Sequence, residues 1–141
     1  MPKRDEFSEK TKQLLARRAG FRYSICQCPT VGPHSEPGQS VYLGEACHIC
    51  EAALNGPRPK QSLAPAERTA ASNGIHLCKV HARLIDVHTA AYTAERLMEI
   101  KSSQEQRIST MVVGSGATSA TYSYLVNSPL LAQIALCEAA K

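Results

Sequence analysis

Two stretches of the chain decide the fold: LGEACHIC at residues 43–50 and NGIHLCKVH at residues 73–81. Residues 41–49 look like a strand or one arm of a hairpin, and residues 74–78 alternate as a short strand does. Residues 79–101 then place apolar side chains at roughly helical spacing. The sequence therefore predicts a hairpin arm, a second strand and a main helix, in that order.

Both stretches contain metal-binding residues at spacings that suit chelation. The three chelating pairs are Cys26-x-Cys28, Cys47-x-x-Cys50 and Cys78-x-x-His81. Two soft ligands on one tight turn can share a tetrahedral zinc ion, and thiolates at neutral pH are held deprotonated by a neighbouring cation. Zinc is therefore favoured over buried cysteines that act as small hydrophobes. Spacing alone favours a site built from the second and third pairs, but it does not decide between that set and one that uses the first pair.

The segments around these stretches are shorter or more polar. The main helix is expected to break near Thr89, and His34, His76 and the cation Arg58 are expected to lie in loops or at the surface. The other expected elements are a helix at 5–19 that ends at Gly20, a β-like segment at 21–28, a Pro/Gly loop at 29–40, a loop at 51–72 with a short helix after Pro65, and a polar hinge at 102–107.

The composition limits the size of the core and the choice of partners. The chain has 141 residues, no Trp, two Phe and five Tyr, so a metal or an oligomer interface is expected to supplement a modest core. The formal net charge is +4, with the excess of cations in the first 22 residues. Such a segment suits a polyphosphate partner, although charge alone is more typical of a solvated helix. The charged N-terminus has no apolar signal segment, which predicts a cytoplasmic protein where clustered cysteines bind metal.

Six segments follow one another along the chain: Ala19-Gly20, PTVGP at 29–33, LGEACHICEAALNGPRP at 43–59, LAPAERTAASNGIHLC at 63–78, LID at 84–86 and YTAERLMEIK at 92–101. In this order they resemble prokaryotic HNH endonuclease domains, which are zinc-braced and adopt the ββα-metal fold. Any single segment is a weak match, but the ordered set is specific. The resemblance covers roughly residues 14–104 and predicts an α+β fold, with a small ββα-metal domain, flanking helices and a C-terminal helical arm.

The resemblance implies a role for each matching residue. His48 occupies the position of the general base, and Asn73 that of the asparagine which supports the loop and orients the base. Cys78 and His81 occupy structural zinc positions, and Cys26 matches the second cysteine of the family's first zinc pair.

The chain also departs from the family at the zinc ligands. Tyr23 replaces the first cysteine of that pair, and Cys28 is expected to supply the missing thiolate. The expected ligands of a structural Zn²⁺ are therefore Cys26, Cys28, Cys78 and His81, with Cys50 in reserve.

A second departure affects the nuclease metal. Many relatives have His directly after the second zinc ligand, where this chain has Ala82. The catalytic ion thus lacks its usual helix ligand. His81 is an alternative ligand, and so are Asp86 and His88.

These matches imply a metal-dependent DNA endonuclease, an effector of bacterial anti-phage defence, in which His48 activates water and Mg²⁺ or Mn²⁺ stabilises the leaving group. The alternative is a degenerate HNH-like zinc module that binds DNA or protein, which Ala82 favours. In either case, a thiolate–imidazole clamp is expected to pin a hairpin against a helix. In the enzyme, the His48 ring would face open solvent.

The expected organisation has three parts. They are a basic segment at 1–13, the HNH-like domain at 14–104 and a C-terminal arm at 105–141, which is uncharged over residues 108–137. Gly, Ser, Thr and Pro in that arm argue against a membrane span. A helix after Pro129 predicts self-association or a partner protein instead.

Overall fold

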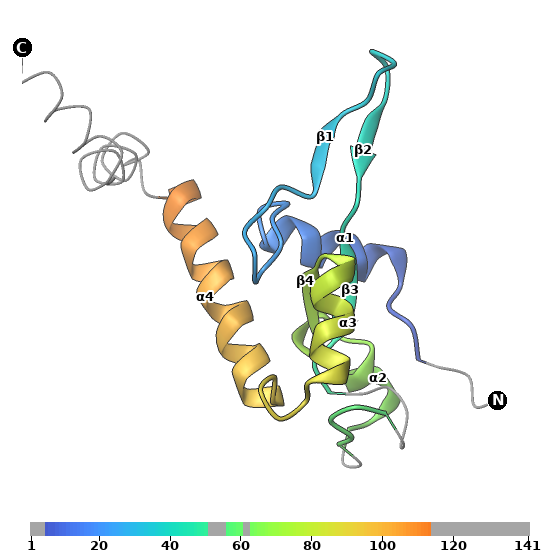
Figure 1. Cartoon of the computed structure of the whole chain (residues 1–141), viewed down its shortest axis with the longest axis vertical. Coiled ribbons are helices and arrows are strands. Elements are labelled where there is room, and N and C mark those ends of the chain that lie inside the picture. The colour runs from blue at the N-terminus through green and yellow to red at the C-terminus, as the bar shows by residue number, and fades with distance from the viewer. Residues whose placement is uncertain (1–4, 51–55, 61–62, 114–141) are drawn as a thin grey trace, which may run out of the picture. The chain divides into compact units, whose positions relative to one another are not determined.

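The computed structural model describes residues 5–50, 56–60 and 63–113. Within these residues the protein is a small α+β structure of four α-helices and two two-stranded antiparallel sheets, which confirms the predicted class (Figure 1). The chain divides into two compact units, residues 1–106 and residues 107–141. All the elements that position the candidate site belong to the first unit.

Helix α1 spans Glu9–Arg18 and begins later than the predicted start at residue 5. Ser8 explains this start, because its hydroxyl accepts the N–H of Thr11 at 3.1 Å and so caps the helix. The helix ends before Gly20, whose φ of 63° lies in the left-handed region that glycine adopts without strain. Phe7, expected on the apolar side of this helix, precedes it and is buried.

Residues 29–40 contain a strand that the sequence did not predict. Strand β1 (Val31–Pro33) pairs antiparallel with β2 (Ser40–Tyr42), and Gly32 lies opposite Val41. Gly and Pro in β1 are poor strand formers, which is why the segment was expected to be a loop. The β-like segment expected at 21–28 contains only the isolated bridge between Arg22 and Pro29.

The second sheet and the helix after it form a ββα unit. Strand β3 (Glu45–His48) pairs antiparallel with β4 (Gly74–Leu77), and His48 lies opposite Gly74. Helix α3 (Lys79–Val87) starts two residues after β4 and packs against β3. Between the strands lie the short helix α2 (Pro65–Arg68), as predicted after Pro65, and the 3₁₀ turn η1 (Ala71–Asn73). The strand predicted at 74–78 is confirmed, whereas the one predicted at 41–49 is divided into β2 and β3, which belong to different sheets.

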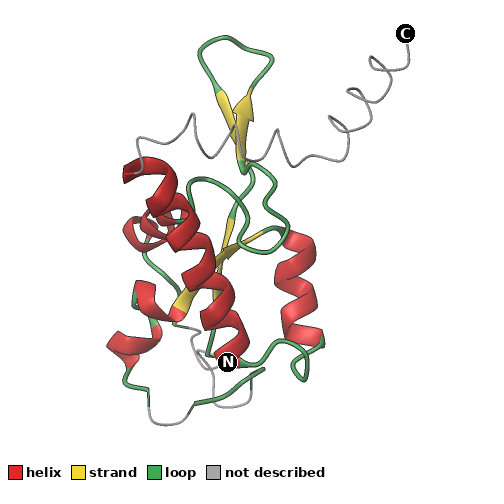
Figure 2. Cartoon of the chain, turned by 90° about the vertical axis from the view of Figure 1, so that its left-hand side faces the viewer, coloured by secondary structure: helices red, strands yellow, loops and turns green. Residues whose placement is uncertain are grey.

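All four residues of β4 are buried, because both faces of this sheet are covered. Ile75 and Leu77 point into the main core, while Gly74 faces α1. A Cβ on Gly74 would lie 2.5 Å from Leu15 Cδ1, so the Leu15 side chain would have to move to accept a larger residue there. Figure 2 shows helices on both sides of these short strands. The main core consists of Ile49, Cys50, Ile75, Leu77, Ile85 and Leu97.

The predicted main helix is two helices. Helix α3 ends at Val87 and α4 spans Ala94–Val113, so the expected break near Thr89 is confirmed. The hinge predicted at 102–107 is wrong, because α4 continues through it. Gln104 in this stretch is 1 % exposed and donates its amide N–H to the carbonyl of Ala19 at 2.9 Å. Polar residues there bond to α1 and do not break the helix.

The C-terminal arm is only partly described. Its residues up to Val113 belong to α4, whereas the predicted helix after Pro129 and most of the uncharged run lie outside the described residues. None of the described helices is both long enough and apolar enough to span a membrane.

Candidate metal centre and the adjoining cavity

Three of the predicted zinc ligands converge at the start of α3. The donor atoms of Cys26, Cys78 and His81 all lie within 4.8 Å of one another. The Sγ atom of Cys78 and Nδ1 of His81 are 3.1 Å apart. In tetrahedral zinc sites, the known Zn–S and Zn–N bond lengths place neighbouring donors about 3.5–3.8 Å apart. The Cys78–His81 distance is below this range and the other distances are at most 4.8 Å, so the two thiols and the imidazole form a candidate metal-binding group.

Local backbone structure brings these donors together. The turn at residues 23–28 is closed by the bond from the N–H of Tyr23 to the carbonyl of Cys28 at 3.0 Å, and Gln27 adopts a left-handed φ of 63°. The N–H of Ser24 donates to the carbonyl of His76 at 2.9 Å, which ties this turn to β4. Cys78 is the N-cap of α3, so one helical turn brings His81 back to it.

Cys28 lies beside this group but is not part of it. Its Sγ atom is exposed and lies 3.6 Å from the carbonyl oxygen of Cys26. Burial raises the pKa of the Tyr23 hydroxyl, and the nearby thiols of Cys78, Cys26 and Cys28 raise it further. The group formed by Cys26, Cys78 and His81 does not include Cys28, so its role as the fourth ligand stays a prediction from the sequence.

The other chelating pair lies elsewhere. Cys50 is buried in the main core, and Cys47 packs against it. Neither belongs to the group formed by Cys26, Cys78 and His81. The structure therefore favours the set that uses the first pair, and it places the reserve ligand Cys50 among apolar side chains.

Asn73 joins the two strands of the hairpin. Its Oδ1 accepts the N–H of Cys50 at 2.8 Å, and its Nδ2 donates to the carbonyls of Cys50 at 2.9 Å and Arg68 at 3.0 Å. The N–H of Ile49 donates to the carbonyl of Asn73 at 2.9 Å. This buried amide therefore fixes the chain immediately after His48, which agrees with the loop-supporting part of the implied role, while the orientation of a catalytic base stays a prediction.

The His48 side chain does not face open solvent. It is 8 % exposed, and its ring stacks on Phe7 with 4.0 Å between ring centroids and 14° between planes. The expectation of an open imidazole is therefore wrong, because the segment before α1 covers one ring face. His48 is instead one of the residues that line a cavity of about 510 Å³. The cavity is lined by Glu6, Phe7, Lys12, Glu45, Ala46, Cys47, His48, Lys79, Ala82, Arg83 and Asp86.

One face of α3 forms the wall opposite β3. Lys79, Ala82, Arg83 and Asp86 are spaced three and four residues apart, so they lie along one side of the helix. Ala82 lines the same cavity as His48. The methyl group there cannot bind an ion.

The three alternative metal ligands are separated by the structure. His81 is directed at Cys78, and His88 makes an edge-on contact with Tyr92 at 6.4 Å between ring centroids. Asp86 alone of the three lines the cavity. Carboxylate oxygen is a preferred ligand of Mg²⁺ and Mn²⁺.

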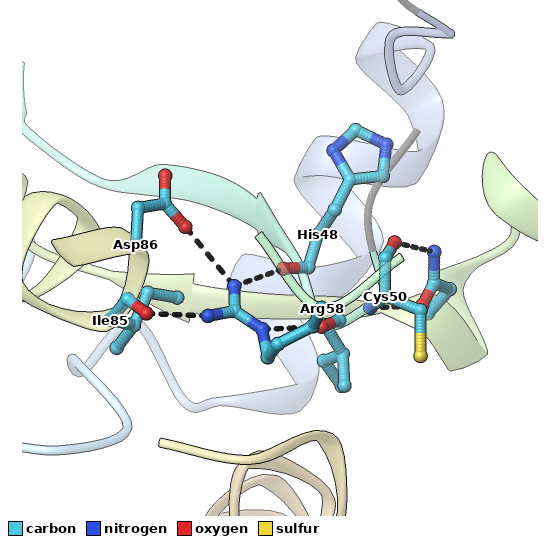
Figure 3. A network of polar contacts seen from close by, with 7 residues as sticks. His48, Cys50, Arg58, Ile85 and Asp86 are labelled. Atoms are coloured by element: carbon cyan, nitrogen blue, oxygen red, sulfur yellow. Dashed lines mark hydrogen bonds and ion pairs between the residues drawn. The ribbon is translucent and has the colours of Figure 1, made fainter. Parts of the chain in front are cut away.

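Arg58 was expected to be a solvated loop cation, and this is wrong. Its side chain is 5 % exposed and forms an ion pair with Asp86 at 3.1 Å. It also donates to the backbone carbonyls of Ile49 at 2.8 Å, His48 at 3.4 Å and Ile85 (Figure 3). The sequence gives only an indirect signal for this residue, an arginine between two prolines in a motif shared with the resembling domains.

Two further side chains support the site from outside the cavity. His76 was expected at the surface, but it is 2 % exposed and stacks between Tyr23 and Tyr42, each at 6.0 Å between ring centroids. Lys101 of α4 donates to the carbonyls of Ala71 and Gly74, on either side of Asn73. Exposed His34, by contrast, lies in a loop as expected.

Comparison with protein-family models and with curated proteins finds no match to this chain.

Proposed function

We propose that the protein is a metal-dependent endonuclease of the HNH type that hydrolyses DNA phosphodiesters. The main support is the ββα unit, in which His48 ends one strand beside Asn73, and the Asn73 amide bonds both backbone groups of Cys50. The hairpin and helix have the order that the motif resemblance implies. The cavity gives His48 a substrate-sized space to act in.

His48 is the proposed general base. The ordinary pKa of a histidine imidazole is about 6.5, so a neutral ring can accept a proton from water near neutral pH. Phe7 limits the ring to one orientation by stacking on it, and Asn73 holds the backbone that follows. Water and the scissile phosphate would enter through the cavity between β3 and α3.

Asp86 is the proposed protein ligand of the catalytic Mg²⁺ or Mn²⁺, because it lies on the cavity one helical turn beyond Ala82. When bound, such an ion would polarise the phosphoryl group and neutralise charge on the leaving oxygen. Cys26, Cys28, Cys78 and His81 would hold a separate structural Zn²⁺. That site braces a domain with few large core side chains.

DNA is the proposed partner because cations border the cavity on both sides. Lys12 comes from α1, and Lys79 and Arg83 come from α3. Phosphate contacts of this kind supply much of the affinity for DNA and weaken as salt rises. The role in anti-phage defence, the cytoplasmic location and an association through residues 105–141 remain predictions from the sequence.

The test is cleavage of supercoiled plasmid by the zinc-loaded full chain with Mg²⁺ or Mn²⁺, and with no added Mg²⁺ or Mn²⁺ as the control arm. The parent should nick the plasmid, and His48→Ala should lower the rate by about 10²–10⁴-fold. His34→Ala is the matched control, because it removes an imidazole from an exposed loop outside the cavity. Equal cleavage by the parent and His48→Ala would refute His48 as the base.

Ala82 supports a second candidate function, a zinc module that binds DNA or protein without cleaving it. The residue at this cavity position lacks any metal-binding group. Zinc content and salt-dependent DNA binding, together with no cleavage at any divalent ion concentration, would favour this function over the nuclease.

A further inference from the structure

Arg58 has a backbone conformation that its residue type disfavours. Its φ is 56°, in the left-handed region, and Pro57 and Pro59 flank it. A residue with a side chain persists in such a conformation where the surroundings fix it, whereas glycine adopts it freely. Because arginine and not glycine occupies this position, we expect the contacts of the arginine side chain to hold the backbone in this conformation.

The guanidinium of Arg58 is buried, and nearly all its donors are used. Nε bonds the carbonyl of Ile49, Nη1 bonds the carbonyl of Ile85, and Nη2 bonds Asp86 Oδ1 at 3.1 Å and the carbonyl of His48 at 3.4 Å. A buried cation is tolerated when it is paired and hydrogen-bonded in this way.

The groups that Arg58 bonds belong to two separate elements. His48 and Ile49 lie where β3 ends, and Ile85 and Asp86 lie in the last turn of α3. The last carbonyls of a helix have no partner within the helix and attract cations. One side chain therefore joins a strand end to a helix end, on the side where both border the cavity.

Arg58 also determines which oxygen of Asp86 is available. Oδ1 is occupied by Nη2 of Arg58, and the other carboxylate oxygen points away from the guanidinium (Figure 3). Asp86 and His48 line the same cavity. The second carboxylate oxygen of Asp86 is thus the one available to a ligand bound in the cavity.

We infer that Arg58 is the positioning residue of this site: its guanidinium fixes the strand end that bears His48 to the helix end that bears Asp86. The inference deepens the proposed function and rests on it for the roles of His48 and Asp86. Lysine cannot replace Arg58, because an ammonium is a point charge without the planar fork that reaches both ends at once.

The first measurement does not depend on catalysis. The ring of Phe7 stacked on His48 shifts the NMR signals of the imidazole protons, so these signals report the position of the strand end. The zinc-loaded full chain labelled at histidine is compared with Arg58→Lys and Arg58→Ala, and His48→Ala assigns the signals. Both Arg58 variants should move the His48 signals toward values for an unstacked ring.

The second measurement is plasmid cleavage. Both variants should lower kcat by about 10²-fold, as expected for a small displacement of catalytic groups, with KM for DNA nearly unchanged. Methylguanidinium added to Arg58→Ala should restore part of kcat. Arg18→Lys is the matched control, because it alters another arginine–carboxylate pair, with Glu105, between α1 and α4. It should leave both kcat and the His48 signals unchanged.

The outcomes separate this inference from the proposed function. Unchanged His48 signals in folded Arg58→Lys would overturn the inference, whether or not the parent cleaves DNA. Shifted signals without cleavage by the parent would keep Arg58 as the residue that positions His48 while refuting the nuclease. Failure of both variants to fold would make Arg58 merely structural, which also overturns the inference.

Discussion

The side-chain amide of Asn73 bonds both the N–H and the carbonyl of Cys50, at 2.8 Å and 2.9 Å, as a neighbouring strand would. After the bond from the N–H of Ile49 to the carbonyl of Asn73, the amide therefore continues the pairing of β3 and β4 to Cys50, two residues beyond His48. The side-chain amide of Asn73 is held by its bonds to the backbone of Cys50, which lies 23 residues away in the chain.

Replacing Asn73 with Ala should destabilise the fold. The change removes two buried hydrogen bonds and one partly buried hydrogen bond, and it leaves the N–H of Cys50 without this partner, at a cost of about 2–4 kcal/mol. Urea unfolding at constant zinc concentration measures the loss. Gln39→Ala, which removes an amide from an exposed loop, should stay close to the parent. Equal stability of the two variants would mean that the Asn73 bonds contribute little.

The ligands of the metal centre can be counted with Co²⁺ in place of zinc. Thiolate-to-metal absorption should fall in Cys26→Ser, Cys28→Ser and Cys78→Ser, by about a third each if three thiolates bind. His81→Ala should keep this absorption but weaken binding. Cys50→Ala is the control and should bind Co²⁺ as the parent does, because its thiol lies in the core. Undiminished absorption in Cys28→Ser would exclude Cys28 as the fourth ligand.

Gly44→Ala should destabilise the protein strongly. An added Cβ would lie 2.0 Å from Cε1 and 2.5 Å from Nε2 of His76, a buried ring without room to move, so the cost is about 1–3 kcal/mol or more. Gly38→Ala meets nothing within 4 Å and serves as the control. A second change, His76→Ala, should relieve the clash, so the double variant should lose less than the sum of the single losses. Strict additivity would contradict this contact.

Acid should weaken the fold through His76. Burial lowers the pKa of His76 from 6.5 to about 4, so the unfolded chain takes up a proton at a higher pH than the folded chain does. The contribution of neutral His76 to the free energy of unfolding is therefore fully present above pH 6.5. It is lost as pH falls from about 6.5 to about 4, by about 3 kcal/mol at most. Unfolding free energies of the parent and His76→Leu, measured across this range at one zinc concentration, isolate the effect. If the unfolding free energies of the two proteins differed by the same amount at every pH, this contribution of His76 would be contradicted.

Strand β4 and helix α3 could be predicted because their signals are local. Alternation in residues 74–78 and the apolar spacing after Cys78 arise from neighbours in the chain, and the structure has β4 and α3 there. The chelating pair at Cys78 and His81 was equally visible, because one helical turn brings the two residues together.

The errors concern polar residues whose partners are distant in sequence. Gln104 was assigned to a hinge because it is polar, yet it is buried against Ala19, 85 residues away. Arg58 was assigned to solvent for the same reason, yet it bonds Ile85, 27 residues away. Polarity indicates a need for hydrogen bonds, and only the folded chain shows whether protein or water meets it.

Cys78 has two roles, as N-cap of α3 and as a member of the candidate metal group. Successive residues of an α-helix are rotated by about 100°, so the point where the chain enters the helix sets the azimuth of every later side chain. A shift of one residue at this thiol would turn Asp86 about 100° around the helix axis, away from the cavity that it lines together with His48. A metal bound at the start of the helix would thus determine which side chain lines that cavity about two turns further on.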